Sequence, residues 1–248
     1  MTRPMTDHGR RAFLRSGGAA ALLPFLTSPF SAFAQSAAAG SMKIGVIGSG
    51  KLGGTVGGLW VKAGHQVLFS SRHPEELKGL VDSLGRNARA GTVEQAVAFG
   101  EVVLIAVPYS ALPQVGRDNA KGLAGKIVLD ACNPTAARDG EIVKEANEMG
   151  VGATSAKYLP GTRLVRAFNS FGAGSFASES HRAGEPIGVP IAGDDPEALK
   201  VAAKLVRDAG FEPVAVPLAR AKEFAPPGPL FRQALPVKEL RQRLGITQ

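Results

Sequence analysis

The spacing of three glycines after a short apolar run is the feature that most narrows what this chain can fold into. Residues 43–47 read Lys-Ile-Gly-Val-Ile, a pattern typical of a strand buried in a parallel sheet. Gly48, Gly50 and Gly53 follow at G-x-G-x-x-G spacing. Residues 55–63 then have the pattern of a helix. Strand, glycine turn and helix in this order predict the βαβ unit of a Rossmann-type domain.

Each glycine has a physical role in such a turn. Gly48 permits the tight turn, Gly50 lets the backbone approach a pyrophosphate, and Gly53 lets the helix pack closely on the strand. The free N–H groups at the start of the helix attract the diphosphate. We therefore predict that a nicotinamide dinucleotide is held by the whole turn, which comprises Gly48, Ser49, Gly50, Lys51, Leu52 and Gly53. A merely structural glycine turn is the alternative interpretation.

The end of the second predicted strand, residues 66–70, indicates which dinucleotide is bound. An acidic residue at this place would accept a hydrogen bond from the ribose 2′-hydroxyl of NAD and would repel a 2′-phosphate. The chain has Ser70, Ser71 and Arg72 there. Two hydroxyl groups and a guanidinium are complementary to a phosphate dianion. The sequence therefore predicts NADP(H) rather than NAD(H).

Strands alternate with helices along the rest of the chain. The pattern predicts further strands at residues 88–90, 101–108, 126–130, 164–169 and 212–216, and helices at 77–84, 92–99, 111–123 and 195–209. This alternation predicts an α/β fold, a Rossmann-type doubly wound parallel sheet with ligands beyond the carboxyl ends of its strands. We assign residues 42–217 to the NADP-binding domain. Residues 218–248, proline-rich and then helical, are predicted to form a short C-terminal helical extension that helps cover the acceptor site or builds a homodimer.

Several residues at predicted strand ends are candidates for the nicotinamide side of the site. Ala106, Val107 and Pro108 end one strand, and Asn133 follows the next. The Asn133 amide is placed to bond the nicotinamide carboxamide or ribose, or it is a turn-forming residue before proline. Cys132 is the only cysteine, which excludes an internal disulfide. It lies just past a strand end, where a nucleophile is one interpretation; with no histidine nearby in sequence to activate it, we interpret it as a small buried residue lining the cofactor site.

The charge pattern argues against nucleic acid as a partner. The formal net charge is +8, but the basic residues are scattered and form no stripe interleaved with aromatic residues. Four histidines and one cysteine show no metal-ligand spacing, so no metal site is predicted.

The first residues resemble an export signal. Arg10 and Arg11 precede Phe13 and Leu14, and a weakly apolar run then leads to Ala-Phe-Ala at residues 32–34. This pattern resembles a twin-arginine signal cleaved after residue 34, with residues 35–41 as a linker. It implies recognition by the twin-arginine export machinery and a periplasmic location. A disordered basic N-terminus and an uncleaved membrane anchor are the alternatives.

Five segments together resemble the deazaflavin-dependent NADP reductase family, which transfers hydride reversibly between NADP(H) and coenzyme F420. They are Ile-Gly-Ser-Gly-Lys-Leu-Gly at residues 47–53, Phe-Ser-Ser-Arg at 69–72, Ala-Val-Pro at 106–108, Ala-Phe-Asn-Ser at 167–170 and Ala-Gly-Asp-Asp at 192–195. The resemblance covers residues 42–231. It implies that Val107, Pro108 and Asn133 border the nicotinamide and that the acceptor pocket is lined by Asn169, Ser170 and Phe171.

The resemblance implies an enzyme that positions two rings face to face and needs no acid or base for the hydride step. Coenzyme F420 or a flavin would then be the co-substrate. A quinone, a chelated ferric ion, and a small carbonyl or imine are alternative acceptors. A protein of another class, which binds NADP without turnover as a sensor or carrier, is the remaining hypothesis.

Overall fold

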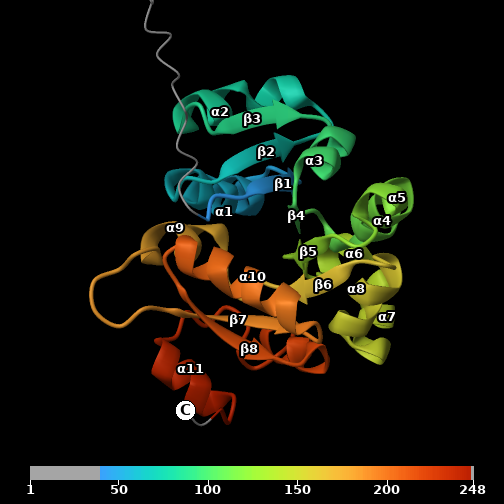
Figure 1. Cartoon of the computed structure of the whole chain (residues 1–248). Helices are drawn as coiled ribbons and strands as arrows, with labels where there is room; N and C mark the ends of the chain where they lie inside the picture. Colours follow the sequence, from blue (N-terminus) through green and yellow to red (C-terminus); the bar gives the residue numbers. More distant parts are fainter. Residues whose placement is uncertain (1–39, 247–248) are drawn as a thin grey trace, which may run out of the picture. The chain divides into compact units, whose positions relative to one another are not determined.

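The computed structural model describes residues 40–246; the predicted signal segment and most of the predicted linker lie outside the described residues. The strands within residues 40–246 form one eight-stranded sheet in the order β3-β2-β1-β4-β5-β6-β7-β8 (Figure 1). They are β1 (Lys43–Ile47), β2 (Gln66–Ser70), β3 (Ala88–Gly91), β4 (Val102–Ile105), β5 (Ile127–Asp130), β6 (Arg163–Arg166), β7 (Gly188–Gly193) and β8 (Glu212–Val216). The predicted α/β fold of Rossmann type is confirmed.

The first six strands are parallel, and their order reverses between β1 and β4. Four of the five residues of β1, and all of β4 and β5, are buried, because helices cover the sheet on both faces. A reversal of strand order leaves a crevice at the carboxyl ends of the two strands, where ligands of such sheets bind. The glycine turn after β1 lies at this crevice.

Helices cover both faces of the sheet. One face carries α1 (Lys51–Lys62), α9 (Ala173–Glu179) and α10 (Pro196–Asp208), and the other carries α3 (Val93–Phe99), α4 (Leu112–Asp118), α5 (Ala120–Leu123) and α8 (Val151–Tyr158). The remaining helical elements are η1 (Pro74–Leu77), α2 (Lys78–Leu84), η2 (Tyr109–Ala111), α6 (Ala136–Asp139), α7 (Ile142–Met149), η3 (Leu218–Phe224) and α11 (Val237–Arg243).

The expectation of a wholly parallel sheet is wrong at β6 and β7, which pair antiparallel. Only Val165 and Arg166 of β6 take part in this pairing, so β7 and its parallel neighbour β8 extend past the carboxyl end of β6. The chain after β6 does not cross back along the sheet, because an aromatic cluster anchors it on α1. Phe168, in the left-handed region at φ 60°, packs edge-on against Trp60 with ring centroids 5.3 Å apart. β7 and β8 therefore form the edge of the sheet beyond β6.

One predicted helix and one predicted strand differ from the structure. The helix predicted over residues 111–123 is divided into η2, α4 and α5, because Asn119 leaves helical geometry and its Nδ2 donates to Val115 O at 2.9 Å. The predicted strand at residues 164–169 ends earlier, at Arg166, where the chain turns. Residues 136–158, for which no element was predicted, form α6, α7 and α8 between β5 and β6.

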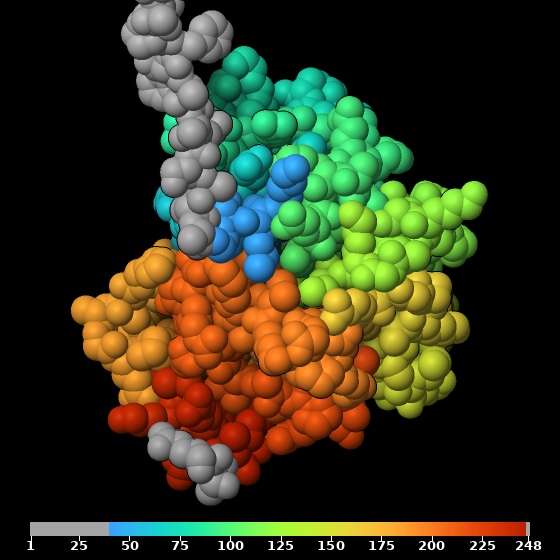
Figure 2. Space-filling model, in the orientation of Figure 1, coloured from blue at the N-terminus to red at the C-terminus, as the bar shows by residue number. Residues whose placement is uncertain are grey.

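The C-terminal extension packs against the antiparallel end of the sheet. Leu240 of α11 is buried over Gly188 of β7, where an added Cβ would come within 2.7 Å of Leu240 Cδ2. In the space-filling view the red C-terminal residues accordingly lie against the orange region that contains β7 and β8 (Figure 2). Among residues 40–246, no helix has both the length and the hydropathy required to cross a bilayer.

Candidate dinucleotide and acceptor site

A cleft of about 900 Å³ lies at the carboxyl ends of β1, β2 and β4. Nine of the residues predicted to bind the cofactor line it: Gly48, Ser49, Gly50, Ser70, Ser71, Arg72, Ala106, Val107 and Pro108. Its other walls include Leu77, Val93 and the helix α4. The structure therefore brings together the glycine turn, the end of β2 and the end of β4, as the Rossmann topology requires.

The glycines of the turn differ in what a side chain would meet. At Gly48, which has φ 90°, a Cβ would lie 2.5 Å from Ala106 O, and at Gly53 it would lie 2.1 Å from Gly48 O. At Gly50 a Cβ would meet nothing within 4 Å. Gly48 and Gly53 are thus required by packing. Gly50 is open on the cleft side, which is the cradle that a pyrophosphate needs.

The start of α1 suits an anion. Its N-cap residue, Gly50, offers no side-chain acceptor to the free N–H groups, and no acidic residue lies in the first turn. These N–H groups carry the positive end of the helix dipole. Lys51, exposed at the first helical position, does not line the cleft. The residues present therefore fit the diphosphate of a dinucleotide.

At the end of β2 the structure corrects one predicted contact. The Ser70 hydroxyl is buried and donates to Val46 O at 2.8 Å, so it is not available to a phosphate. The Ser70 carbonyl accepts the N–H groups of Gly48 and Ser49 and thereby shapes the glycine turn. Arg72 is exposed at the cleft, and it forms no ion pair with any carboxylate in the described part of the chain. Ser71 and Arg72 line the cleft and remain the predicted groups for a 2′-phosphate.

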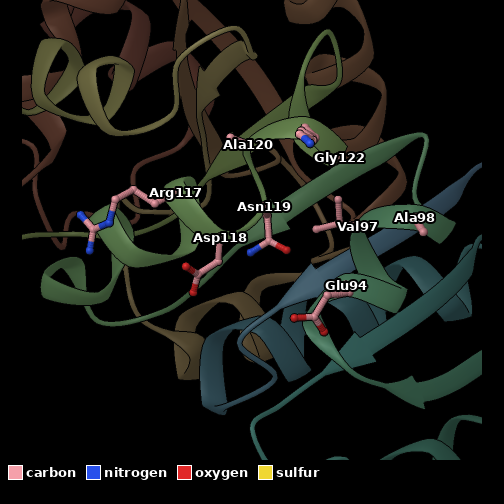
Figure 3. Close-up of a pocket in the computed structure, with 9 residues that line it drawn as sticks. Glu94, Val97, Ala98, Arg117, Asp118, Asn119, Ala120 and Gly122 are labelled. Carbon is pink, nitrogen blue, oxygen red and sulfur yellow. The ribbon is translucent and has the colours of Figure 1, made fainter.

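A recess beside the cofactor cleft was not predicted from the sequence. It lies between α3 and the α4–α5 break and shares Glu94, Asp118 and Asn119 with the cleft. Figure 3 shows that Arg117 points away from the other labelled side chains of the recess. Two carboxylates and an amide suit hydrogen-bond donors and disfavour phosphate. The cleft therefore carries both charges: Arg72 lies at the end of β2, and Glu76, Glu94 and Asp118 also line the cleft.

A second hollow, of about 290 Å³, adjoins the cleft. The two share Ala106, Val107 and Pro108, the predicted neighbours of the nicotinamide. The second hollow, here called the acceptor hollow, is also lined by Leu52, Ala131, Cys132, Asn133, Thr135, Arg138, Asn169, Phe171, Gly172, Phe231 and Arg232. Leu52 thus faces the acceptor hollow and not the cofactor cleft.

Of the predicted acceptor residues, Asn169 and Phe171 line the hollow and Ser170 does not. Ser170 is buried beneath it, and its carbonyl accepts the Arg232 backbone N–H at 2.6 Å. Asn133 and Asn169 bond each other, Nδ2 of Asn169 donating to Oδ1 of Asn133 at 3.1 Å. Asn133 Nδ2 in turn donates to the Asn169 carbonyl at 2.6 Å. This mutual pairing joins the ends of β5 and β6.

Charged residues that the sequence reasoning missed support this pair. Arg166 is buried in ion contact with Asp130, and its Nη2 donates to Asn133 Oδ1 at 3.0 Å. Asp130 and Arg166 each end an otherwise apolar run, and they lie directly opposite each other on β5 and β6. Opposite charges at the ends of two neighbouring apolar strands are the sequence signal that could have predicted this ion pair. Arg138 pairs with buried Asp139. Burial alone would raise the pKa of Asp139, but Arg138 and two backbone N–H groups lower it to about 2.

Cys132 is buried in the floor of the hollow, with its Sγ donating to Ile105 O at 3.4 Å. Burial, followed by the nearby Asp130 charge, raises the pKa of this thiol, so it is a poor nucleophile. The interpretation of Cys132 as a small buried residue is confirmed, but it lines the acceptor hollow and not the cofactor cleft. Within residues 40–246, no group of three or more His, Cys, Asp or Glu side chains is arranged to hold a metal ion.

The fold and the glycine turn are those of a Rossmann-type dinucleotide-binding domain. Residues 43–134 match the family model described as NADP oxidoreductase, coenzyme F420-dependent. The matched residues run from β1 through the glycine turn and the end of β4 to Asn133 and Pro134.

Known proteins resemble this chain in sequence or in fold. The rat (Rattus norvegicus) metalloreductase STEAP3 is 32% identical over 189 residues, which are 73% of this chain and 35% of that protein, so this chain spans about a third of its length. A hypothetical protein from Sinorhizobium meliloti aligns with a TM-score of 0.69 at 25% identity, covering 79% of this chain and 95% of that one. A candidate F420-dependent NADP reductase from Arthrobacter sp. FB24 aligns with a TM-score of 0.60 at 22% identity, covering 83% and 96%, and shares the fold.

Proposed function

We propose that this protein transfers hydride between NADPH and a deazaflavin or flavin-like acceptor. One observation carries the proposal. The cofactor cleft and the acceptor hollow share the wall formed by Ala106, Val107 and Pro108. A dinucleotide with its diphosphate at Gly50 and its 2′-phosphate at Arg72 would extend toward this shared wall. A ring in the acceptor hollow would then meet it there, which is the proximity that hydride transfer requires.

The residues present would act by binding and orientation. Gly50 and the start of α1 would hold the diphosphate, and Ser71 with Arg72 would select the 2′-phosphate. When bound, NADPH supplies a hydride, which is one proton carrying two electrons. The acceptor takes a further proton from water. Phe171 and Phe231 give the hollow apolar walls against which a ring would pack.

The hollow itself favours a ring acceptor over a small carbonyl or imine. Reduction of a carbonyl or imine calls for a proton donor at the reacting atom. The residues that line the hollow include no Lys, His, Tyr, Asp or Glu, and the Cys132 thiol is buried with a raised pKa. A flavin or deazaflavin ring needs no such donor, because its proton can come from solvent.

Reduction of a chelated metal is the second candidate function, favoured by the 32% identity with a metalloreductase. A ferric ion accepts one electron, whereas a nicotinamide gives up two together as hydride. A flavin that receives the hydride and releases single electrons resolves this mismatch. We therefore propose a flavin-like ring as the immediate acceptor even where a ferric chelate is the final one.

The first experiment is a titration of the purified protein with NADPH and NADH by nicotinamide fluorescence. Absorbance at 340 nm then follows NADPH oxidation with coenzyme F420, FMN, a quinone and a ferric chelate as acceptors. We expect NADPH-preferring binding and oxidation by a ring acceptor. Tight NADPH binding without oxidation by any acceptor would replace the proposal with a sensor or carrier.

We further propose that residues 1–34 direct export through the twin-arginine machinery to the periplasm. That pathway carries folded proteins, so an enzyme could leave the cytoplasm with its dinucleotide already bound. The test is cell fractionation of the full chain and of a variant with Arg10→Lys and Arg11→Lys. The unmodified chain should be recovered from the periplasm and the variant from the cytoplasm; equal distribution of the two would remove this proposal.

A further inference from the structure

The wall of the acceptor hollow that comes from the C-terminal extension carries an arginine without a carboxylate partner. Arg232 is exposed at the hollow and forms no ion pair with any acidic residue of the described part of the chain. Its guanidinium carbon lies 5.3 Å from the centroid of the Phe231 ring. An arginine that stacks on an aromatic ring and keeps its N–H groups open is suited to bind an anion.

The backbone holds Arg232 at the hollow. Its φ is 64°, in the left-handed region that residues other than glycine rarely adopt, and such strain is maintained only by the surrounding structure. The hydrogen bond from the Arg232 N–H to Ser170 O, 2.6 Å long, supplies that constraint by tying the extension to the segment after β6. The extension therefore contributes a fixed positive group to the hollow.

A second guanidinium lies on the same hollow. Arg138 is half exposed and is oriented by Asp139 and by the Asn133 carbonyl, to which its Nη2 donates at 2.8 Å. Its own charge is balanced by Asp139, but its Nη1 has no hydrogen-bond partner among the described residues. No acidic residue lines the hollow. Its net charge is therefore positive, with Arg232 as the uncompensated group.

We infer that the acceptor is anionic, and that Arg232, aided by Arg138, binds a phosphate or carboxylate carried beside its redox-active ring. This inference rests on the proposed function. The hollow, at about 290 Å³, has room for a ring system and not for a whole flavin nucleotide. The ring would occupy the apolar part beside Val107 and Phe171, and its charged substituent would lie at the rim, where both arginines are exposed.

FMN and riboflavin test the inference because they share one ring and differ by a phosphate. Binding is measured by flavin fluorescence, with no turnover required, for the unmodified protein and for Arg232→Gly. Glycine adopts φ 64° without strain, so this variant is expected to fold with an unchanged thermal midpoint. Arg86→Ala is the matched control, since it removes an exposed positive charge at the amino end of β3, on the opposite edge of the sheet.

The expected result is that FMN binds about tenfold or more tightly than riboflavin, the gain typical of a charge-assisted hydrogen bond. Arg232→Gly should abolish this preference and leave riboflavin affinity unchanged, whereas Arg86→Ala should keep it. Inorganic phosphate or citrate should displace FMN from the unmodified protein and identify the preferred anion. Equal affinities for FMN and riboflavin in the unmodified protein, or a preference that survives Arg232→Gly, would overturn the inference.

The same ligands separate this inference from the proposed function. Oxidation of NADPH by riboflavin and FMN with equal KM would support the reductase and overturn the anion subsite. An Arg232-dependent preference for FMN without any NADPH oxidation would support the subsite and overturn hydride transfer to a flavin.

Discussion

Arg166 and Asp130 form an ion pair with both side chains fully buried, at positions directly opposite each other on the parallel strands β6 and β5. Arg166 also donates to Ser155 Oγ, to the Cys132 carbonyl and to Asn133 Oδ1. A buried charge is tolerated only when it is paired and hydrogen-bonded. The pair therefore fixes the floor of the acceptor hollow by holding Asn133, which in turn holds Asn169.

Arg166→Met is expected to destabilise the protein by about 3–5 kcal/mol, because it leaves the Asp130 carboxylate buried without a partner. Chemical denaturation measures the loss of unfolding free energy. Arg163→Met is the matched control in the same strand. Arg163 pairs with Asp195 at the surface, where loss of a pair typically costs about 1 kcal/mol or less. Equal losses in the two variants would contradict the role given to burial.

Gly50→Ala is expected to leave stability unchanged and to weaken NADPH binding by about tenfold or more, since the added methyl group fills only the space over the cradle. Gly53→Ala should instead destabilise the fold by about 1–3 kcal/mol or more, because its Cβ would lie 2.1 Å from Gly48 O. Thermal unfolding and NADPH titration of both variants separate the two effects. Gly79→Ala is the control: Gly79 lies at an exposed position of α2, and a Cβ there would meet nothing within 4 Å. This variant should neither weaken NADPH binding nor lower stability. Unaltered NADPH affinity in Gly50→Ala would remove the diphosphate from this turn.

A variant with Ser71→Asp and Arg72→Ala should lose affinity for NADPH and keep its affinity for NADH. The guanidinium contact to the 2′-phosphate is worth about 1.5–3 kcal/mol, and the new carboxylate would repel that phosphate. We expect the ratio of the NADH to the NADPH dissociation constant to fall by at least about tenfold, as measured by fluorescence titration. Arg86→Ala should leave the ratio unchanged. Unchanged NADPH affinity in the double variant would show that the 2′-phosphate binds elsewhere.

The buried His65 makes stability depend on pH. It lies between α1 and β2 and is buried, with Nδ1 accepting from Met42 N at 3.0 Å and Nε2 lying 2.9 Å from Asp208 Oδ2. Burial lowers the pKa of His65, and Lys204 adds to this, while Asp208 opposes it only in part.

The unfolded chain therefore binds the proton more readily than the folded one. The stabilisation is complete above the unfolded pKa of about 6.5 and is lost as the pH falls toward the lower folded pKa. We expect the unfolding free energy to decrease between pH 7.5 and 5.5, and His65→Gln to flatten this dependence. His73→Gln, which changes an exposed histidine, should leave the pH dependence of the unfolding free energy unchanged. If the unfolding free energy of the His65→Gln variant still decreased between pH 7.5 and 5.5, the pH dependence would come from other groups.

The parts of the fold that the sequence predicted are those built by local patterns. The run at residues 43–47 and the glycines after it predicted β1, the turn and α1, because a buried strand, a tight turn and a helix start each have residue requirements of their own. The capping box formed by Thr92 and Gln95 explains why the helix at residues 92–99 was also found. The antiparallel β7 was missed, because its direction depends on where Phe168 packs and not on its own residues.

The candidate site divides in the same way. The sequence by itself predicted a dinucleotide site, since the glycine turn and Arg72 lie at the ends of predicted strands, where local backbone geometry and charge carry the signal. Three features were decided only by the tertiary structure. The Ser70 hydroxyl donates its hydrogen bond to Val46 O, and Arg166 and Asp130 meet in the core. Arg232 of the C-terminal extension lines the same hollow as Val107. The physical reason is distance along the chain: a turn or a helix start depends on neighbouring residues, whereas partners separated by many residues meet only after the whole sheet has formed.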